Sequence, residues 1–210
     1  MKRAFLLLLV ACATAPVAQG PLPPPVHGPK LVPVYEWSKD KTLTAFQSQM
    51  MEVLRAEDGK RLFEHLDPNV RTSFGPQTGI EAFKMAWYTQ PHWEELLAIF
   101  FMGGGSFRDN DHFVAPSVYA NWPERFDPYS FVAVMSRGVP LRESRDPNSK
   151  AVAILSFDIV KPLGEKGHVR LADGRVGWVD PRFLWSPAGY HVELVRERGT
   201  WKIEALVSGR

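Results

Sequence analysis

Cysteine is almost absent from this chain of 210 residues, which contains only Cys12. A single cysteine cannot form a disulfide within the chain, so stability has to come from packing. A cysteine-type peptidase also needs a cysteine nucleophile beside a histidine. Because Cys12 lies in a segment that we expect to be a secretion signal, the sequence excludes that class of cell-wall enzyme.

Long apolar runs and an excess of charge of one sign are also missing. No apolar run reaches the eighteen residues that indicate a membrane-spanning helix. Lysine and arginine total 25 and aspartate and glutamate 23, which gives a formal net charge of +2, and no run of five like charges occurs. This balance offers no electrostatic basis for binding nucleic acid, so we expect no nucleic-acid partner.

Motifs of catalysis and metal binding are missing as well. The sequence has no G-x-S-x-G motif and no His-x-x-x-His spacing, and Gly103–Gly105 lacks the G-K-[ST] ending of a phosphate-binding loop. Asp109, Asp111 and His112 offer oxygen and imidazole ligands for a metal, but the glycine and glutamate of an EF-hand loop do not follow. We interpret this stretch as a solvated turn and expect no catalytic residue, metal or cofactor.

The first eighteen residues have the pattern of a secretory signal peptide. Met1-Lys2-Arg3 is basic, Ala4 to Val10 is apolar, and small residues follow. Leu9-Val10-Ala11-Cys12 resembles the bacterial lipobox, which makes Cys12 a lipidation candidate, while cleavage at an A-x-A site ending at Ala13 is the alternative. Either route predicts an exported protein in the periplasm or on the outer surface of the envelope. The membrane would be a partner only through a lipid anchor.

Residues 19–36 are predicted to be a proline-rich linker. Gly20 to Pro33 holds six prolines, which cannot join a helix or a central strand and favour an extended spacer.

Residues 37–130 are predicted to form a mostly helical domain with a connector at its end. Apolar residues from Leu43 to Leu54 follow helical spacing behind Thr42, a candidate N-cap. Thr78-x-x-Glu81 is a capping box for a later helix, and Pro91 suits the first turn of another. The order of these elements also resembles the opening of the nuclear-transport-factor-like α+β cone, although the long antiparallel strands of that fold are not evident here.

Residues 131–186 read as a run of short strands separated by frequent turns. Ala151–Leu155 and Ile159–Leu163 are apolar runs of strand length, and Ala172-Asp173-Gly174 is a turn in which glycine can take positive φ. This pattern predicts a small all-β barrel. The fold class expected for the whole chain is therefore α+β: a helical domain, then this barrel, then a C-terminal β-hairpin.

The same region carries a family resemblance. The matching segments are Val139–Arg142, Ala153–Leu155, Val169–Val179 (VRLADGRVGWV) and Phe183-Leu184. In this order and spacing they resemble a bacterial SH3 domain, although Gly167-His168 stands where many relatives have an aromatic residue. The resemblance implies a binding or targeting module of the cell envelope, with a cell-wall peptide or an envelope protein as partner. The ligand-binding candidates are Trp178, Asp180, Arg182, Phe183 and Trp185.

Residues 187–210 are predicted to form a β-hairpin. Tyr190–Arg196 and Trp201–Val207 flank a polar turn and carry mostly alternating apolar residues. An isolated hairpin is marginal in water, so we expect it to pack on the barrel or on the helical half.

Three functions remain open from the sequence. The first is a non-enzymatic envelope protein whose SH3-like module binds a peptide or protein partner, with peptidoglycan as a candidate. The second is an envelope enzyme with its catalytic site in the helical half and the module as its targeting arm. The third is a structural or assembly subunit. A pocket of convergent titratable groups in residues 43–130 would favour the enzyme, whereas a filled apolar core there would favour the binder.

Overall fold

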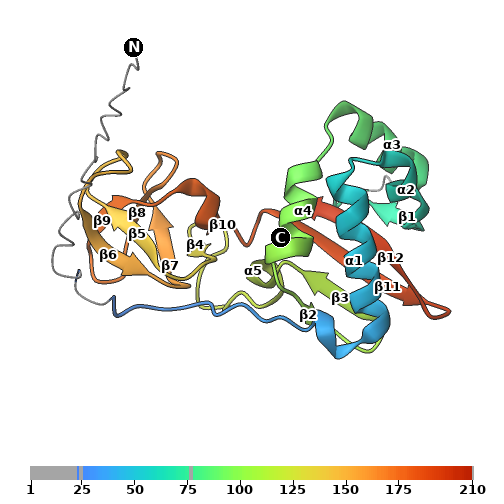
Figure 1. Cartoon of the computed structure of the whole chain (residues 1–210), viewed down its shortest axis with the longest axis horizontal. Helices are drawn as coiled ribbons and strands as arrows, with labels where there is room; N and C mark the ends of the chain where they lie inside the picture. Colours follow the sequence, from blue (N-terminus) through green and yellow to red (C-terminus); the bar gives the residue numbers. More distant parts are fainter. Residues whose placement is uncertain (1–22, 24–25, 76–77, 210) are drawn as a thin grey trace, which may run out of the picture.

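The computed structural model describes residues 23, 26–75 and 78–209. The predicted signal peptide and its lipidation candidate Cys12 lie outside the described residues. Figure 1 shows two lobes side by side, joined by extended segments of chain. No helix among the described residues combines the length and the apolar character needed to cross a bilayer.

The first lobe is built on a five-stranded sheet with the order β1-β12-β11-β3-β2. Its strands are β1 (Leu66–Arg71), β2 (Ser106–Phe107), β3 (His112–Ala115), β11 (Tyr190–Glu197) and β12 (Thr200–Ser208). β1 runs parallel to β12, and the other pairs are antiparallel. β1 contains Pro68, which has no backbone N–H to donate, and it lies at the edge of the sheet, where proline is tolerated.

Helices cover one face of this sheet. They are α1 (Lys41–Arg55), α2 (Gly59–Glu64), α3 (Ile80–Thr89) and α4 (Trp93–Met102), preceded by the short 3₁₀ helix η1 (Trp37–Lys39). α1 is found where its apolar spacing predicts, but its N-cap is Asp40, whose carboxylate accepts the backbone N–H groups of Thr42 and Leu43. α3 begins after Gly79 without a side-chain cap, so the predicted capping box at Thr78 is wrong.

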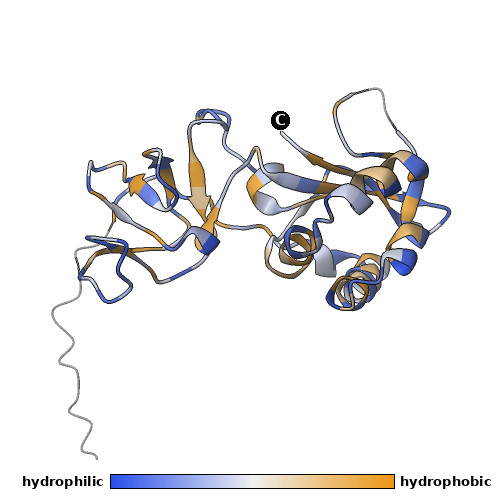
Figure 2. Ribbon diagram, turned by 90° about the horizontal axis from the view of Figure 1, so that it is seen from above, coloured by the Kyte–Doolittle hydropathy of each residue, from blue (hydrophilic) through white to orange (hydrophobic). Residues whose placement is uncertain are grey.

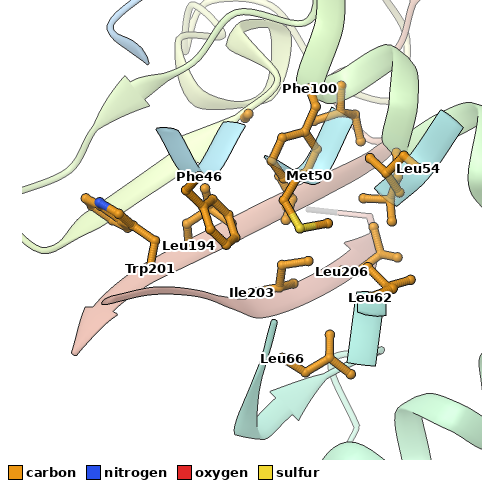
Figure 3. Close-up of a cluster of buried hydrophobic side chains, with 14 of the residues drawn as sticks. Phe46, Met50, Leu54, Leu62, Leu66, Phe100, Leu194, Trp201, Ile203 and Leu206 are labelled. Atoms are coloured by element: carbon orange, nitrogen blue, oxygen red, sulfur yellow. The ribbon is translucent and has the colours of Figure 1, made fainter. Parts of the chain in front are cut away.

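The helices and the sheet enclose the main hydrophobic core. Phe46, Met50 and Leu54 of α1 point toward Leu194, Ile203 and Leu206 of the central strands (Figure 3). Phe100 of α4 and Leu62 of α2 join the same cluster. The interior of this lobe is therefore filled by apolar side chains. At roughly 1.5–3 kcal/mol for each large side chain, this burial is the main stabilising contribution.

The second lobe is a seven-stranded sheet with the order β10-β4-β7-β8-β9-β5-β6. Its strands are β4 (Val132–Val134), β5 (Val139–Arg142), β6 (Ala151–Leu155), β7 (Ile159–Pro162), β8 (His168–Arg170), β9 (Val176–Trp178) and β10 (Leu184–Trp185), with the 3₁₀ helix η2 (Pro181–Phe183) before β10. Val134, Leu155 and Val169, from distant positions in this order, share one buried cluster, so the sheet curls around its own core. Figure 2 shows hydrophobic residues concentrated in the strands and hydrophilic ones in the loops.

The described part of the proline-rich segment, residues 26–36, runs along both lobes. The Leu31 N–H donates to Phe157 O at 2.8 Å in the second lobe, and Val34 O accepts from Gly105 N at 2.7 Å in the first. Leu31 is buried in a third apolar cluster together with residues of both lobes. We call residues 26–36 the strap, and in Figure 1 it is the blue chain that joins the lobes.

The fold class predicted from the sequence is wrong. The chain is mostly β, with two sheets instead of one small barrel, and residues 37–130 do not form a helical domain. The reason is long-range pairing: β12 lies between β1 and β11, so the C-terminal hairpin supplies the centre of the first sheet. The second sheet is inserted between α5 (Ser117–Ala120) and β11. As expected for a marginal unit, the hairpin does pack on another part of the chain, namely the first lobe.

Candidate functional site

A groove of about 680 Å³ opens on the second lobe. It lies where β5, β9 and the loop of residues 143–150 meet the chain around η2. The residues that line it are Pro140, Arg142, Ser144, Arg145, Pro147, Lys166, Trp178, Val179, Asp180, Pro181 and Phe183. Three prolines and two aromatic side chains give it stiff walls, because proline and aromatic residues have few rotatable bonds.

Trp178 provides the aromatic surface of the groove. It lies directly opposite His168 in the β8–β9 pair, and the two rings stack with their centroids 4.5 Å apart. The guanidinium carbon of Arg145 lies 4.4 Å from the centre of the indole, a cation–π contact. His168 is the residue at which the sequence departs from the aromatic residue of many bacterial SH3 domains, and its imidazole still supplies a flat ring against the tryptophan.

The charge of the groove is positive. Arg142, Arg145 and Lys166 line it, and its one acidic residue, Asp180, is paired with Arg182 just outside. Hydrogen bonds from Arg182 hold the pKa of Asp180 below its ordinary value. At neutral pH this carboxylate is therefore charged and bound to Arg182. Among the described residues, Lys166 has no acidic partner within ion-pair distance.

Two of these cations are held in place by neighbouring loops. Arg145 pairs with Glu165 at 2.5 Å, and both side chains are largely exposed. Arg142 donates to the backbone carbonyl of Ser149 at 2.5 Å and is not used by a carboxylate. The groove therefore offers Arg142 and Lys166 as cations that an anionic ligand can reach without first breaking an ion pair.

The structure brings together three of the five residues predicted as ligand-binding candidates. Trp178, Asp180 and Phe183 line the groove. Arg182 lies beside it and binds Asp180 through Nε and Nη2 at 3.0 and 2.6 Å from Oδ2. Trp185 lies elsewhere: it is opposite Ala133 in the β10–β4 pair and packs in the apolar cluster between the lobes.

The basic residues of the groove were missed from the sequence. Arg145 lies in the polar loop 142–150, which reads only as a turn signal, and Lys166 lies in a second turn. Their proximity to Trp178 depends on the pairing of β5 with β9, in which Arg142 is opposite Trp178. A local pattern does not contain that pairing, so only the aromatic end of the site could be found from the motif.

The acidic side chains of the turn at residues 109–112 bind other groups of the protein. Asp109 Oδ1 accepts the backbone N–H of Asp111 at 2.8 Å, and its carboxylate also contacts the His112 ring. Asp111 pairs with Arg196 of β11 at 2.9 Å. Across the described part of the chain, no group of three or more histidine, cysteine, aspartate or glutamate side chains is arranged to hold a metal.

Three of the four segments that resemble a bacterial SH3 domain lie on adjacent strands of the second sheet, whereas Phe183-Leu184 lies where η2 meets β10, at the other end of the strand order. Val139–Arg142 forms β5, Ala153–Leu155 belongs to β6, and Val169–Val179 spans β8 and β9. This placement makes one continuous surface from segments that are separate in the sequence. No family model, curated protein or solved structure matches the chain.

Proposed function

We propose that this chain is a non-enzymatic protein of the cell envelope that binds a carboxylate-bearing peptide in the groove of the second lobe. The observation that carries the proposal is the position of the stacked Trp178 beside Arg142 and Lys166, two cations that form no ion pair with a carboxylate of the described chain. An extended peptide can lay its backbone and apolar side chains on Trp178 and Phe183. Its carboxylates can then meet Arg142 and Lys166 through charge-assisted hydrogen bonds.

The resemblance to bacterial SH3 domains supports the same reading, because it implies binding to envelope peptides. The stem peptide of peptidoglycan is the first ligand to test, since it is short and carries free carboxylates. The filled apolar core of the first lobe supports a binding protein over an enzyme. Among the described residues that line the groove, no nucleophile is placed beside a base.

Binding to purified sacculi and to a fluorescently labelled stem peptide tests this proposal. We expect the Lys166→Ala and Arg142→Ala variants to bind about three- to tenfold more weakly, which corresponds to roughly 0.7–1.4 kcal/mol. Binding should also weaken with added salt, because the contacts are between exposed charges. The control is Lys161→Ala, which removes an exposed lysine of β7 outside the groove.

Two results would contradict the proposal. One is a wild-type protein that binds neither sacculi nor the stem peptide. The other is a pair of groove variants that bind as tightly as the control Lys161→Ala, because the ligand would then lie outside the groove.

The envelope location of this proposal rests on the order of residues in the signal peptide. If Cys12 is acylated, labelled palmitate enters the protein, and Cys12→Ser abolishes the labelling. Exported protein that remains unlabelled and begins after Ala13 would show ordinary cleavage instead. Recovery of the chain from the cytosol with Met1 intact would overturn export.

A further inference from the structure

A second groove, of about 850 Å³, lies on the first lobe between α3 and the sheet. Its position is set by α3, by the residues just after β1 and by the beginning of β11. Ala82 and Ala86 lie one helical turn apart on the lining face of α3. Their short side chains leave space that larger residues would fill, which explains why the surface is hollow here.

The floor of this groove is apolar and rigid. Phe83 and Trp87 stack nearly parallel, with ring centroids 5.6 Å apart and an interplanar angle of 14°. Both are almost fully buried, as is Leu206 of β12 beside them. Trp93 packs edge-on against Trp87, with the ring centroids 4.7 Å apart.

The walls of the groove are polar but uncharged. They consist of side chains that form hydrogen bonds without a permanent charge, namely Thr72, Thr78, Thr89, Gln90, His92 and Tyr190. His92 lies against Tyr190, with ring centroids 4.2 Å apart. Its Nδ1 is 3.8 Å from the carboxylate of Glu95, too long for a hydrogen bond, so a ligand can use this ring nitrogen.

Permanent charge is nearly absent from the lining. Among the described residues that line the groove, Glu81 is the only acidic one, and no lysine or arginine contributes. The Glu81 carboxylate accepts from Lys84 Nζ at 2.8 Å, and the side chain is 83% exposed, so it faces solvent at the rim. This groove therefore contrasts with the basic groove of the second lobe.

From this lining we infer that the groove on the first lobe binds a neutral saccharide. An anionic ligand would find no lysine or arginine, and a cation would find only a carboxylate that is already paired. A wholly apolar ligand would remove water from the threonines, Gln90 and His92 without replacing their hydrogen bonds, which is costly. A sugar ring has C–H groups on its faces for the accessible apolar side chains of Ala82, Met85 and Ala86, which lie above the buried Phe83 and Trp87, and hydroxyl groups around its edge for the walls.

This inference does not depend on the peptide proposed for the second lobe. The two grooves share no lining residue and belong to different sheets. Either ligand can fail to bind while the other binds.

Isothermal titration with chitotetraose, a neutral tetramer of N-acetylglucosamine, tests the inference on the full exported chain. We expect saturable binding by the wild type and a Kd at least about fivefold higher for Gln90→Ala, since an exposed hydrogen-bonding side chain is lost. His92→Phe keeps a ring against Tyr190 but removes both ring nitrogens, and it should weaken binding similarly. Gln49→Ala, an exposed glutamine of α1 outside the groove, is the matched control and should bind as the wild type does.

Three outcomes would overturn the inference. The first is no binding of chitotetraose by the wild type at millimolar concentration. The second is binding that Gln90→Ala and His92→Phe leave intact but Lys166→Ala weakens, which would place the sugar in the basic groove. The third is binding of indole, a neutral aromatic probe, in the absence of any binding of the tetramer, which would show an apolar site.

Discussion

Trp201 illustrates how one buried polar atom can join two distant elements. Its side chain is 2% exposed in the main core, and its Nε1–H donates to Thr42 Oγ1 at 2.9 Å. Thr42 lies in the first turn of α1, where its hydroxyl also contacts the capping Asp40. A buried N–H needs a partner, so this bond sets the position of β12 against the start of α1.

Replacing Thr42 with valine should therefore destabilise the protein. Thr42→Val keeps the shape of the side chain but leaves the indole N–H of Trp201 without an acceptor, at a cost of about 1–3 kcal/mol. Thr42→Ser keeps the hydroxyl and is the matched control. Urea unfolding followed by tryptophan fluorescence measures both. Equal stability of the valine and serine variants would show that the hydrogen bond contributes nothing.

Glu193 makes the stability of the first lobe depend on pH. The pKa of Glu193 is held below its ordinary value by the neighbouring His191 ring, whose Nε2 lies 3.7 Å from the carboxylate, and by the guanidinium groups of Arg71 and Arg108. Arg71 lies on β1 and Glu193 on β11, so this ion pair bridges β12, which lies between them. A lowered pKa means that the unfolded chain binds a proton first as the pH falls.

The contribution of Glu193 is therefore present above its unfolded pKa of about 4.5 and is lost as the pH falls through its lower folded value. We expect Glu193→Gln to be less stable than the wild type at pH 7, with a difference that shrinks below pH 4.5. Unfolding in urea between pH 3 and pH 7 measures this. Glu197→Gln, an exposed change on the same strand, should follow the wild type at every pH. A difference that stays constant across this range would contradict the assignment.

Among the elements, those defined by local signals could be predicted and those defined by pairing could not. Ala151–Leu155 is a strand as expected, and Gly174 has the positive φ of the predicted turn, +88°. Both depend on residues adjacent in the sequence. The first sheet was missed because β1 pairs with β12, more than 120 residues away, which no periodicity records.

The resemblance to the nuclear-transport-factor-like cone implied long antiparallel strands that residues 37–130 do not contain. The long antiparallel pair of the first sheet is β11 and β12, after the inserted second sheet. The candidate site also combines residues that the sequence predicts with residues that only the folded sheet brings together. Trp178, Asp180 and Phe183 belong to a motif and could be found, whereas Arg145 and Lys166 reach Trp178 only through the folded sheet.

Removal of the C-terminal hairpin should abolish the first sheet, because β11 and β12 are its central strands. A chain that ends at Ser186 loses Leu194, Trp201 and Ile203 from the main core. Each large side chain contributes roughly 1.5–3 kcal/mol by burial, against 5–15 kcal/mol for a typical whole domain. We expect the truncated chain to lose the cooperative thermal transition of the first lobe, measured by circular dichroism. A chain that ends at Val207 keeps these residues and is the control. Truncation at Ser186 without a change in melting temperature would show that the hairpin is an appendage.

For the whole molecule, the strap is the segment that contacts both sheets. Residues 26–36 hydrogen-bond to both lobes, and Lys30 forms an ion pair at 2.8 Å with Asp158, which is almost fully buried. Leu31 packs with Val118 of α5 and Trp122 just after it, and with Ala133 and Ile159 of the second sheet. Trp185 also packs in this junction, and for that reason its side chain lies away from the groove of the second lobe. A segment that reads as a spacer in the sequence is thus part of the folded structure.

Leu31→Ala is the change that tests this role of the strap. Leu31 is 5% exposed, and its truncation removes buried contacts and leaves a cavity, which costs about 2–5 kcal/mol in a protein core. Because Leu31 belongs to the cluster shared by the lobes, the loss should loosen the junction more than either sheet. We expect differential scanning calorimetry to show one transition for the wild type and two separated transitions for the variant. Val32→Ala, next to it and 58% exposed, should melt as the wild type does. If Leu31→Ala keeps a single transition at the wild-type temperature, the strap does not couple the lobes, and each sheet is stable without it.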